Sequence, residues 1–123
     1  MKHLFTPFFF IFYLTSFAQT QAEMNVEAQE NYKKADQELN TVYKKLLTAN
    51  KSDTLFIKNL KTSQRIWITF RDAEINLKYP DKDPGYYGSI HPMCYYLYLA
   101  ELTNDRIKTL NSYLTSEEGN VCE

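Results

Sequence analysis

Residues 21–49 have the sequence QAEMNVEAQENYKKADQELNTVYKKLLTA, and this stretch decides the fold class. Apolar side chains recur in it every three or four positions, with charged and amide residues between them. An α-helix turns once every 3.6 residues, so this spacing places the apolar side chains along one side of a helix. The stretch therefore predicts a long amphipathic helix, which a capping box at Thr20 and Glu23 would begin. The positions predicted to face a core are Met24, Ala28, Tyr32, Ala35, Leu39, Val42 and Leu46.

In two later segments, residues 54–79 and 90–113, apolar residues recur with the same period. Asp53 is a good N-cap for the first, and Pro80 ends it because proline disfavours helical geometry in the residue before it. Ser89 is expected to cap the second, whose first turn tolerates Pro92. The positions predicted to face the core are Phe56, Leu60, Ser63, Trp67, Phe70 and Leu77, then Met93, Leu97, Ala100, Ile107, Leu110 and Leu114.

In no segment do apolar and polar residues alternate with the period of two that is typical of a strand. Three amphipathic helices with short connections predict an all-α fold, a small antiparallel bundle, because no single helix can bury its own apolar side. A chain of 123 residues supports one domain with one core. Residues 81–88 are expected to form a loop, and the polar tail from about residue 115 is expected to be loose.

The first 18 residues predict a cleavable signal peptide. Lys2 and His3 precede a short apolar run, and Ser16 and Ala18 place small residues at positions −3 and −1 of a cleavage site. The apolar run is shorter than the ~20 residues of a membrane span, although an uncleaved anchor helix is the alternative. The residue directly after Ala18 is Gln19, not cysteine, so a lipoprotein anchor is not indicated. We expect a domain of residues 19–123, periplasmic or secreted, with no membrane span after cleavage.

Charge argues against a nucleic-acid partner. The chain carries 14 basic and 15 acidic residues, and loss of Lys2 with the signal peptide leaves a net charge of 13 − 15 = −2. A chain with this net charge lacks the excess of positive charge with which proteins bind a phosphate backbone. Residues 79–123 alone hold three basic and seven acidic groups, so this half is mildly acidic and would favour a basic protein partner.

The two cysteines, Cys94 and Cys122, are candidates for a disulfide, since an exported protein meets an oxidising compartment. A helix from Cys94 to Leu114 would rise roughly 30 Å. The eight residues that follow reach at most about 26–29 Å. The bridge therefore closes only if the tail doubles straight back or the helix ends early, and pairing and free thiols both remain open.

No catalytic or metal-binding arrangement stands out, and we expect neither enzymatic activity nor a cofactor. Ser89 and His91 could be imagined as a hydrolytic pair, but no nucleophile elbow is present, so we expect Ser89 to be a helix cap and His91 an exposed first-turn residue. His91 and Cys94 would supply two metal ligands on one helical face, whereas a zinc site needs three or four. No metal site is predicted.

Two groups of residues are candidates for binding a partner. Six of the ten tyrosines fall between positions 79 and 98, and tyrosine suits interfaces because it combines contact area with a hydrogen-bonding tip. Gln64, Trp67 and Arg71 share one helical face, and Asp72 follows them. This second group is either a recognition site or a core tryptophan whose polar neighbours bond other helices. Candidate partners for Arg71 are Asp36, Glu74 and Glu101.

Five segments in order resemble the N-terminal domain of the lysozyme inhibitor LprI family. They are Thr20-Gln-Ala-Glu-Met-Asn25, Tyr32-x-x-Ala-Asp-x-Glu-Leu-Asn40-x-x-Tyr43, Leu60-x-x-x-Gln64-x-x-Trp67-x-x-x-Arg71-Asp72-Ala73, Gly88-Ser89-Ile90-x-Pro92-Met93 and Leu102-Thr103-x-x-Arg106-x-x-x-Leu110. The resemblance marks eight residues as family motif positions, structural or binding: Asp36, Asn40, Gln64, Trp67, Arg71, Asp72, Thr103 and Arg106. The chain departs from the family where cysteines are common, at Val26, Ile75 and Tyr98, so the family's disulfides cannot be carried over.

The resemblance implies an exported bacterial helical protein that inhibits lysozyme-type muramidases. A loop such as residues 81–91 would fill the sugar-binding cleft of the enzyme around its two catalytic carboxylates. The residues expected to bind the partner are Asp81, Asp83, Tyr86, Tyr87, Ser89 and His91. The alternative is a protein-interaction or structural module of the cell envelope that inhibits nothing.

Overall fold

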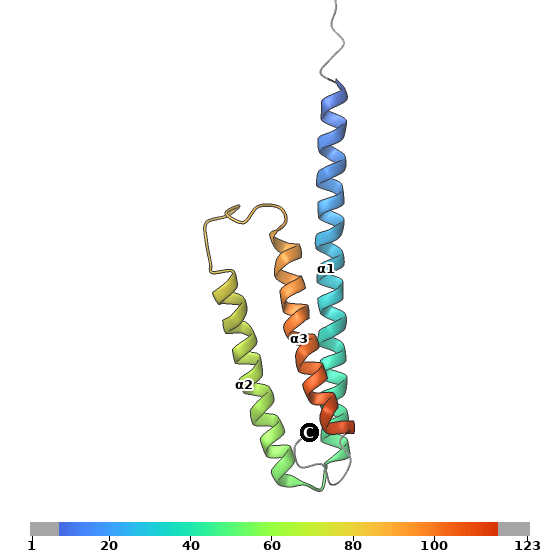
Figure 1. Cartoon of the computed structure of the whole chain (residues 1–123), viewed down its shortest axis with the longest axis vertical. Coiled ribbons are helices and arrows are strands. Elements are labelled where there is room, and N and C mark those ends of the chain that lie inside the picture. Colours follow the sequence, from blue (N-terminus) through green and yellow to red (C-terminus); the bar gives the residue numbers. More distant parts are fainter. Residues whose placement is uncertain (1–7, 116–123) are drawn as a thin grey trace, which may run out of the picture.

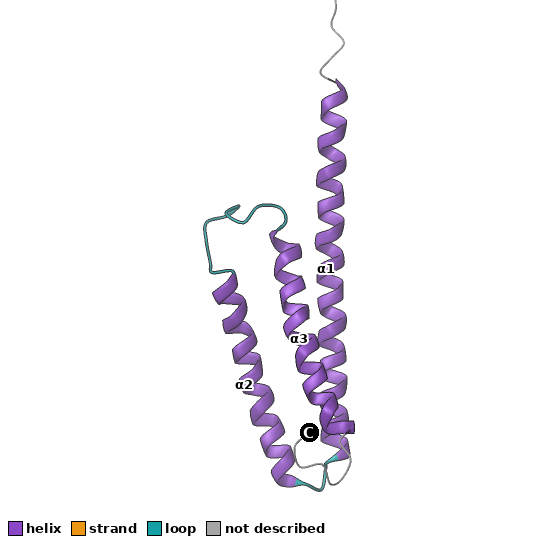
Figure 2. Cartoon of the chain, in the orientation of Figure 1, coloured by secondary structure: helices purple, strands orange, loops and turns teal. Residues whose placement is uncertain are grey.

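The computed structural model describes residues 8–115, with side chains from Thr20 onward. Three helices make up this part: α1 (Phe8–Ala49), α2 (Thr54–Lys78) and α3 (His91–Thr115). Residues 8–115 contain no strand, so the predicted all-α class is confirmed (Figure 2). The chain runs along α1, back along α2 and forward again along α3 (Figure 1). The closely packed pair, α1 and α3, therefore points in the same direction, and α2 is antiparallel to both.

Local sequence signals explain most of the helix ends. The Asp53 carboxylate accepts the backbone N–H of Phe56 at 2.9 Å, so the predicted N-cap of α2 is confirmed. α2 ends at Lys78, and Tyr79 closes it by donating its N–H to the carbonyl of Ile75 at 2.8 Å, directly before Pro80. The predicted start near Thr20 is wrong for the full chain. The helical backbone of α1 already begins at Phe8 and continues through that position.

The core lies where α1 and α3 pack along each other, with α2 against one side. Leu39, Val42 and Leu46 of α1 meet Ile107 and Leu110 of α3, and Leu60 of α2 completes this cluster. Leu46 and Leu110 are essentially inaccessible to water. Tyr43, Leu47, Phe56 and Trp67 pack against the cluster while remaining partly exposed. Trp67, predicted as core, thus lies at the core's edge.

Several predicted core positions are wrong, on all three helices. Phe70 is 49% exposed and Leu77 76%, while the residues of α2 that are buried are Leu60, Gln64 and Ile75. The reason is that α2 contacts its neighbours along a narrow strip, because α1 and α3 already bury most of each other's apolar surface. Met24, Leu97 and Leu114 are also more than a third exposed, whereas Leu99 and Thr103 are buried without having been predicted. No helix in the described part is long and apolar enough to cross a membrane.

Candidate functional site

The loop between α2 and α3 is built on two glycines with left-handed backbone. Gly85 has φ 83° and Gly88 φ 75°, a region that side chains with a Cβ rarely occupy. The first turn is closed by the N–H of Tyr86, which donates to the carbonyl of Asp83 at 3.1 Å. The second is closed by Gly88, which donates to Gly85 at 3.1 Å. These turns hold Tyr86 and Tyr87 at fixed positions on a loop that sequence analysis had identified only as irregular.

Aromatic rings from this loop pack against rings from the end of α2 and the start of α3. We call this group the tyrosine cluster: Tyr79, Tyr86, Tyr87, His91 and Tyr95. Tyr87 stacks on His91 with ring centroids 4.5 Å apart and an interplanar angle of 18°. Tyr79 meets both edge-on, at 5.7 Å and 5.0 Å. Such arrangements each add about 0.5–1.5 kcal/mol beyond simple burial. The Tyr87 hydroxyl also donates to the carbonyl of Pro80 at 2.7 Å, which ties the loop to the end of α2.

Burial raises the pKa of Tyr79 and Tyr87, and neighbouring acidic groups raise it further. Both phenols therefore stay protonated at physiological pH, as the bond donated by the Tyr87 hydroxyl to Pro80 requires. The Nδ1 atom of His91 is buried and has no hydrogen-bond partner among the described residues. His91 is thus a half-buried member of the cluster, not the exposed first-turn residue that sequence analysis offered.

An open hollow of about 530 Å³ lies between the loop and the first turn of α3. Its lining combines aromatic rings with charged side chains, including Asp81, Lys82, Asp83, Tyr86 and Tyr95. The Lys82 ammonium sits over the Tyr86 ring at 5.7 Å from its centroid, a cation–π contact. A surface of this composition can accept both apolar groups and hydrogen-bonding or cationic groups of a partner.

The structure brings five of the six predicted partner-binding residues to this hollow and its rim. Asp81, Asp83 and Tyr86 are exposed, Tyr86 to 67%, and Tyr87 and His91 are half-buried in the cluster. Ser89 is different. The predicted cap is wrong because α3 begins at His91, so the N-cap position is Ile90. Ser89 contributes its carbonyl instead, which accepts the side-chain N–H of Asn25 at 2.9 Å.

That bond belongs to a set of contacts that fastens the loop to α1. Gln21 donates to the Asn25 amide oxygen at 2.9 Å, so the side chain that holds Ser89 is itself oriented. One turn further along α1, Gln29 donates to the Tyr96 hydroxyl at 3.3 Å, and Tyr32 stacks on the Tyr96 ring at 6.0 Å. Periodicity does not predict these roles of Gln21 and Asn25, although both residues lie in the first segment of the family resemblance.

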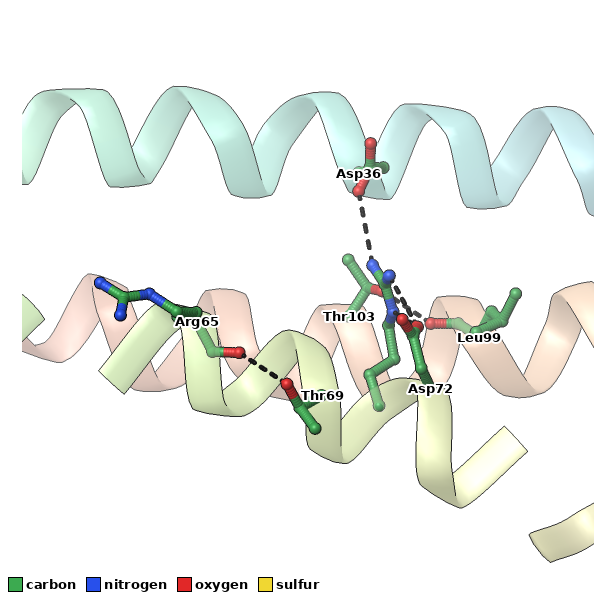
Figure 3. A network of polar contacts seen from close by, with 7 residues as sticks. Asp36, Arg65, Thr69, Asp72, Leu99 and Thr103 are labelled. Atoms are coloured by element: carbon green, nitrogen blue, oxygen red, sulfur yellow. Dashed lines mark hydrogen bonds and ion pairs between the residues drawn. The ribbon is translucent and has the colours of Figure 1, made fainter. Parts of the chain in front are cut away.

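A second group, which we call the arginine network, joins all three helices. Arg71 of α2 is bonded to the Asp72 carboxylate at 2.8 Å and reaches toward Asp36 of α1 at 4.0 Å. Figure 3 labels the two carboxylates, Asp36 and Asp72. Arg106 of α3 donates from Nε to the Gln64 amide oxygen at 3.0 Å and from Nη2 to the Ser63 hydroxyl at 2.9 Å.

Both guanidinium groups lie close to the Trp67 ring, that of Arg71 at 5.5 Å and that of Arg106 at 6.0 Å from its centroid. Burial lowers the pKa of Arg106. Of the three candidate partners for Arg71, Asp36 is the one in reach, while Glu74 accepts the Tyr98 hydroxyl at 3.3 Å instead. The network therefore has the geometry of the structural alternative, in which Arg71 and Arg106 bond neighbouring side chains around an aromatic ring.

Six of the eight motif positions belong to this network. Thr103 is fully buried beside it on α3 and donates its hydroxyl to the carbonyl of Leu99 at 2.7 Å (Figure 3). Asn40 is exposed on α1 and stands apart. No group of three or more His, Cys, Asp or Glu side chains in the described part is placed to hold a metal ion.

The candidate disulfide falls partly outside the described residues. Cys94 is half-buried in the first turn of α3, and Cys122 lies outside the described residues. Because α3 continues to Thr115, the alternative in which the helix ends early does not apply. Pairing of the two cysteines and free thiols therefore both stay open.

The sequence matches the family described as lysozyme inhibitor LprI over residues 15–110, a range that includes both the arginine network and the loop. The chain belongs to the LprI family. It is also similar to an uncharacterized protein of Rhizobium meliloti (strain 1021), with 31% identity over 112 residues, covering 82% of this chain and 78% of the relative. No solved structure matches it. An LprI chain is expected to act by binding, and inhibition needs no catalytic group of its own.

Proposed function

We propose that this LprI chain inhibits a lysozyme-type muramidase by placing its loop, residues 81–91, in the enzyme's sugar-binding cleft. The observation that carries the proposal is that the loop presents one exposed aromatic side chain, while the residue beside it is held in place by contacts with the rest of the protein. Tyr86 is 67% exposed, whereas the neighbouring Tyr87 is held by Pro80 and His91. Family membership supplies the class of target.

Rigidity of the loop supports this mode of binding. A flexible loop loses conformational entropy when it enters a cleft, at about 0.5–1.5 kcal/mol for each immobilised side chain. Here the two glycine turns, the Tyr87 bond to Pro80 and the Asn25 bond to Ser89 fix the backbone in the free protein. More of the contact energy made by Tyr86 is then available for affinity.

The chemistry of the loop also fits such a cleft. Muramidase cleavage depends on two carboxyl groups, one of them protonated, and a phenol hydroxyl can donate to one or accept from the other. Asp81 and Asp83 are exposed at the rim, where carboxylates act mainly on the rate of encounter with a basic enzyme of the animal type. An inhibitor of this kind must meet its target outside the cytoplasm. Export through a signal peptide of residues 1–18 is therefore part of the proposal.

An inhibition assay with matched variants tests the proposal. Purified protein should inhibit at least one of several lysozymes of different types. Tyr86→Ala should weaken inhibition about fivefold or more, since interface tyrosines often contribute more than about 1 kcal/mol. Tyr113→Ala is the control, because Tyr113 is also exposed (56%) but lies near the opposite end of α3. Intact mass of the exported protein should show Gln19 as the first residue.

The results of this assay test the inhibitor function and the position of the binding surface separately. If wild-type protein leaves every lysozyme active, the inhibitor proposal is wrong and the alternative, an interaction module of the cell envelope, replaces it. If wild type inhibits but Tyr86→Ala does so equally well, the function stands and the loop is the wrong surface. A retained Met1 would contradict export by cleavage.

A further inference from the structure

A second hollow lies between α2 and α3, toward the start of α2 and the end of α3 and so away from the loop. Its volume is about 270 Å³. Because the two helices are antiparallel (Figure 1), residues early in α2 meet residues late in α3. We call this hollow the Arg106 pocket, and its lining includes Phe56, Leu60, Ser63, Arg106, Leu110 and Tyr113.

The Arg106 pocket is apolar at one end and polar at the other. The rings of Phe56 and Tyr113 meet edge-on at the apolar end, with centroids 6.0 Å apart. The buried side chains of Leu60 and Leu110 continue the apolar lining. At the polar end, Arg106 donates to the Ser63 hydroxyl at 2.9 Å. Arg106 and Tyr113 lie seven positions, about 10 Å, apart along α3, so the pocket suits an elongated molecule with one polar end.

The charge of Arg106 has no counter-charge in the part of the chain that the structure describes. Its Nε and Nη2 atoms donate to neutral oxygens, those of Gln64 and Ser63. Its Nη1 atom has no hydrogen-bond partner among the same residues, and no ion pair there includes Arg106. One face of this half-buried guanidinium is therefore available to an anion from outside the bundle.

Arg71 shows what a satisfied guanidinium looks like in the same bundle. It lies beside the same tryptophan ring, but two carboxylates face it, Asp72 at 2.8 Å and Asp36 at 4.0 Å. A charge at the edge of a core is normally paired in this way, since removing it from water is costly. Burial lowers the pKa of Arg106, and the nearby group that acts in the other direction is a phenol, that of Tyr113.

We propose that the Arg106 pocket binds a small monocarboxylate with an apolar chain, with the carboxylate on Arg106 and the chain directed toward Phe56 and Tyr113. Among the described residues Arg106 is the one cation in the lining, so a single negative charge fits better than a phosphate with two. A volume of 270 Å³ equals that of about nine water molecules, close to the size of a carboxylic acid with eight or so carbons. This pocket is separate from the loop that is proposed to inhibit lysozyme.

Titration calorimetry with octanoate tests the binding. The purified protein should bind octanoate with a Kd of about 0.1–1 mM, as expected for a ligand of about ten non-hydrogen atoms. Octan-1-ol carries the same chain without the charge, and it should bind at least about tenfold more weakly because it forms no charge-assisted hydrogen bond. Octanoate should also change the fluorescence of Trp67, whose ring lies 6.0 Å from the Arg106 guanidinium.

A pair of aspartate variants tests the position of the site. Ser63 is exposed and already bonds Arg106, so Ser63→Asp supplies the missing counter-charge from within the chain. This variant should bind octanoate at least about tenfold more weakly and keep or raise the wild-type Tm. Thr62→Asp is the control. It adds the same charge at an exposed position about 100° further around α2 and should bind octanoate as wild type does.

Several results would overturn the proposal. They are the absence of saturable octanoate binding, equal affinity for octanoate and octan-1-ol, and equal octanoate affinity of the Ser63→Asp and Thr62→Asp variants. Glu117 and Glu118 follow α3 in the sequence and offer an alternative source of carboxylate. Binding that appears only when both are replaced by glutamine would show that the chain's own carboxylates occupy Arg106, and a free monocarboxylate would then be the wrong occupant.

Discussion

Replacing Arg106 by Met should release α2 from α3. Arg106 donates two hydrogen bonds across this contact, to Gln64 at 3.0 Å and to Ser63 at 2.9 Å, and its guanidinium lies 6.0 Å from the Trp67 ring. Gln64 is 8% exposed, so its amide oxygen would be left buried without this donor. That loss costs about 1–3 kcal/mol, and the cation–π contact adds about 0.5–1.

We therefore expect Arg106→Met to lower the free energy of unfolding by about 2–3 kcal/mol, or roughly 10–20 °C in Tm for a domain of this size. Gln64→Leu should lower the free energy of unfolding by about 1 kcal/mol, because Arg106 keeps its hydrogen bond to the Ser63 hydroxyl. The double variant should cost less than the sum of the two, by about 1–2 kcal/mol, since an apolar pair then replaces the polar one.

Urea unfolding measures these values with two probes. Circular dichroism follows all three helices, and the fluorescence of Trp67, the one tryptophan in the chain, follows the contact between α2 and α3. Lys108→Met is the control, because Lys108 is exposed on α3 and pairs only with the neighbouring Asp105. The reasoning is refuted if Arg106→Met costs no more than Lys108→Met, or if the double variant is additive within about 0.5 kcal/mol.

Three further predictions concern stability. Trp67→Ala should cost about 2–3 kcal/mol in a urea melt, less than the 3–5 of a fully buried aromatic, because Trp67 lies at the edge of the core; a loss below 1 kcal/mol would exclude a structural role. Asp53→Ala should cost about 1 kcal/mol by thermal melting, with Asp53→Asn nearly neutral since it keeps a capping oxygen. Burial and the nearby Glu74 raise the pKa of Tyr98, so folding favours the protonated phenol. This stability is complete below about pH 10, the ordinary pKa of tyrosine, and is lost as pH rises through the folded-state pKa. Tyr98→Phe should therefore show a smaller decline in Tm than wild type as pH rises above about 10.

Local signals in the sequence determined where α2 and α3 begin and end, to within two residues. Asp53 supplies an oxygen for free N–H groups, and Pro80 prevents helical geometry before it, and both effects depend only on neighbours in the chain. The period of 3.6 likewise determined the all-α class. The family segments were predictable because their residues occur in order along 20–110.

Only the tertiary structure decided which side of each helix is buried. α2 carries apolar residues on two opposite sides, and periodicity cannot tell the side with Leu60 and Ile75 from the side with Ile66 and Leu77. The same limit hid the joining of Asn25 to Ser89, 64 positions apart, and of Gln64 to Arg106, 42 positions apart. A helix propensity depends on residues within a turn or two, whereas burial depends on which other helix occupies the space, and that is settled only when α1 and α3 pack and leave α2 one narrow strip to bury.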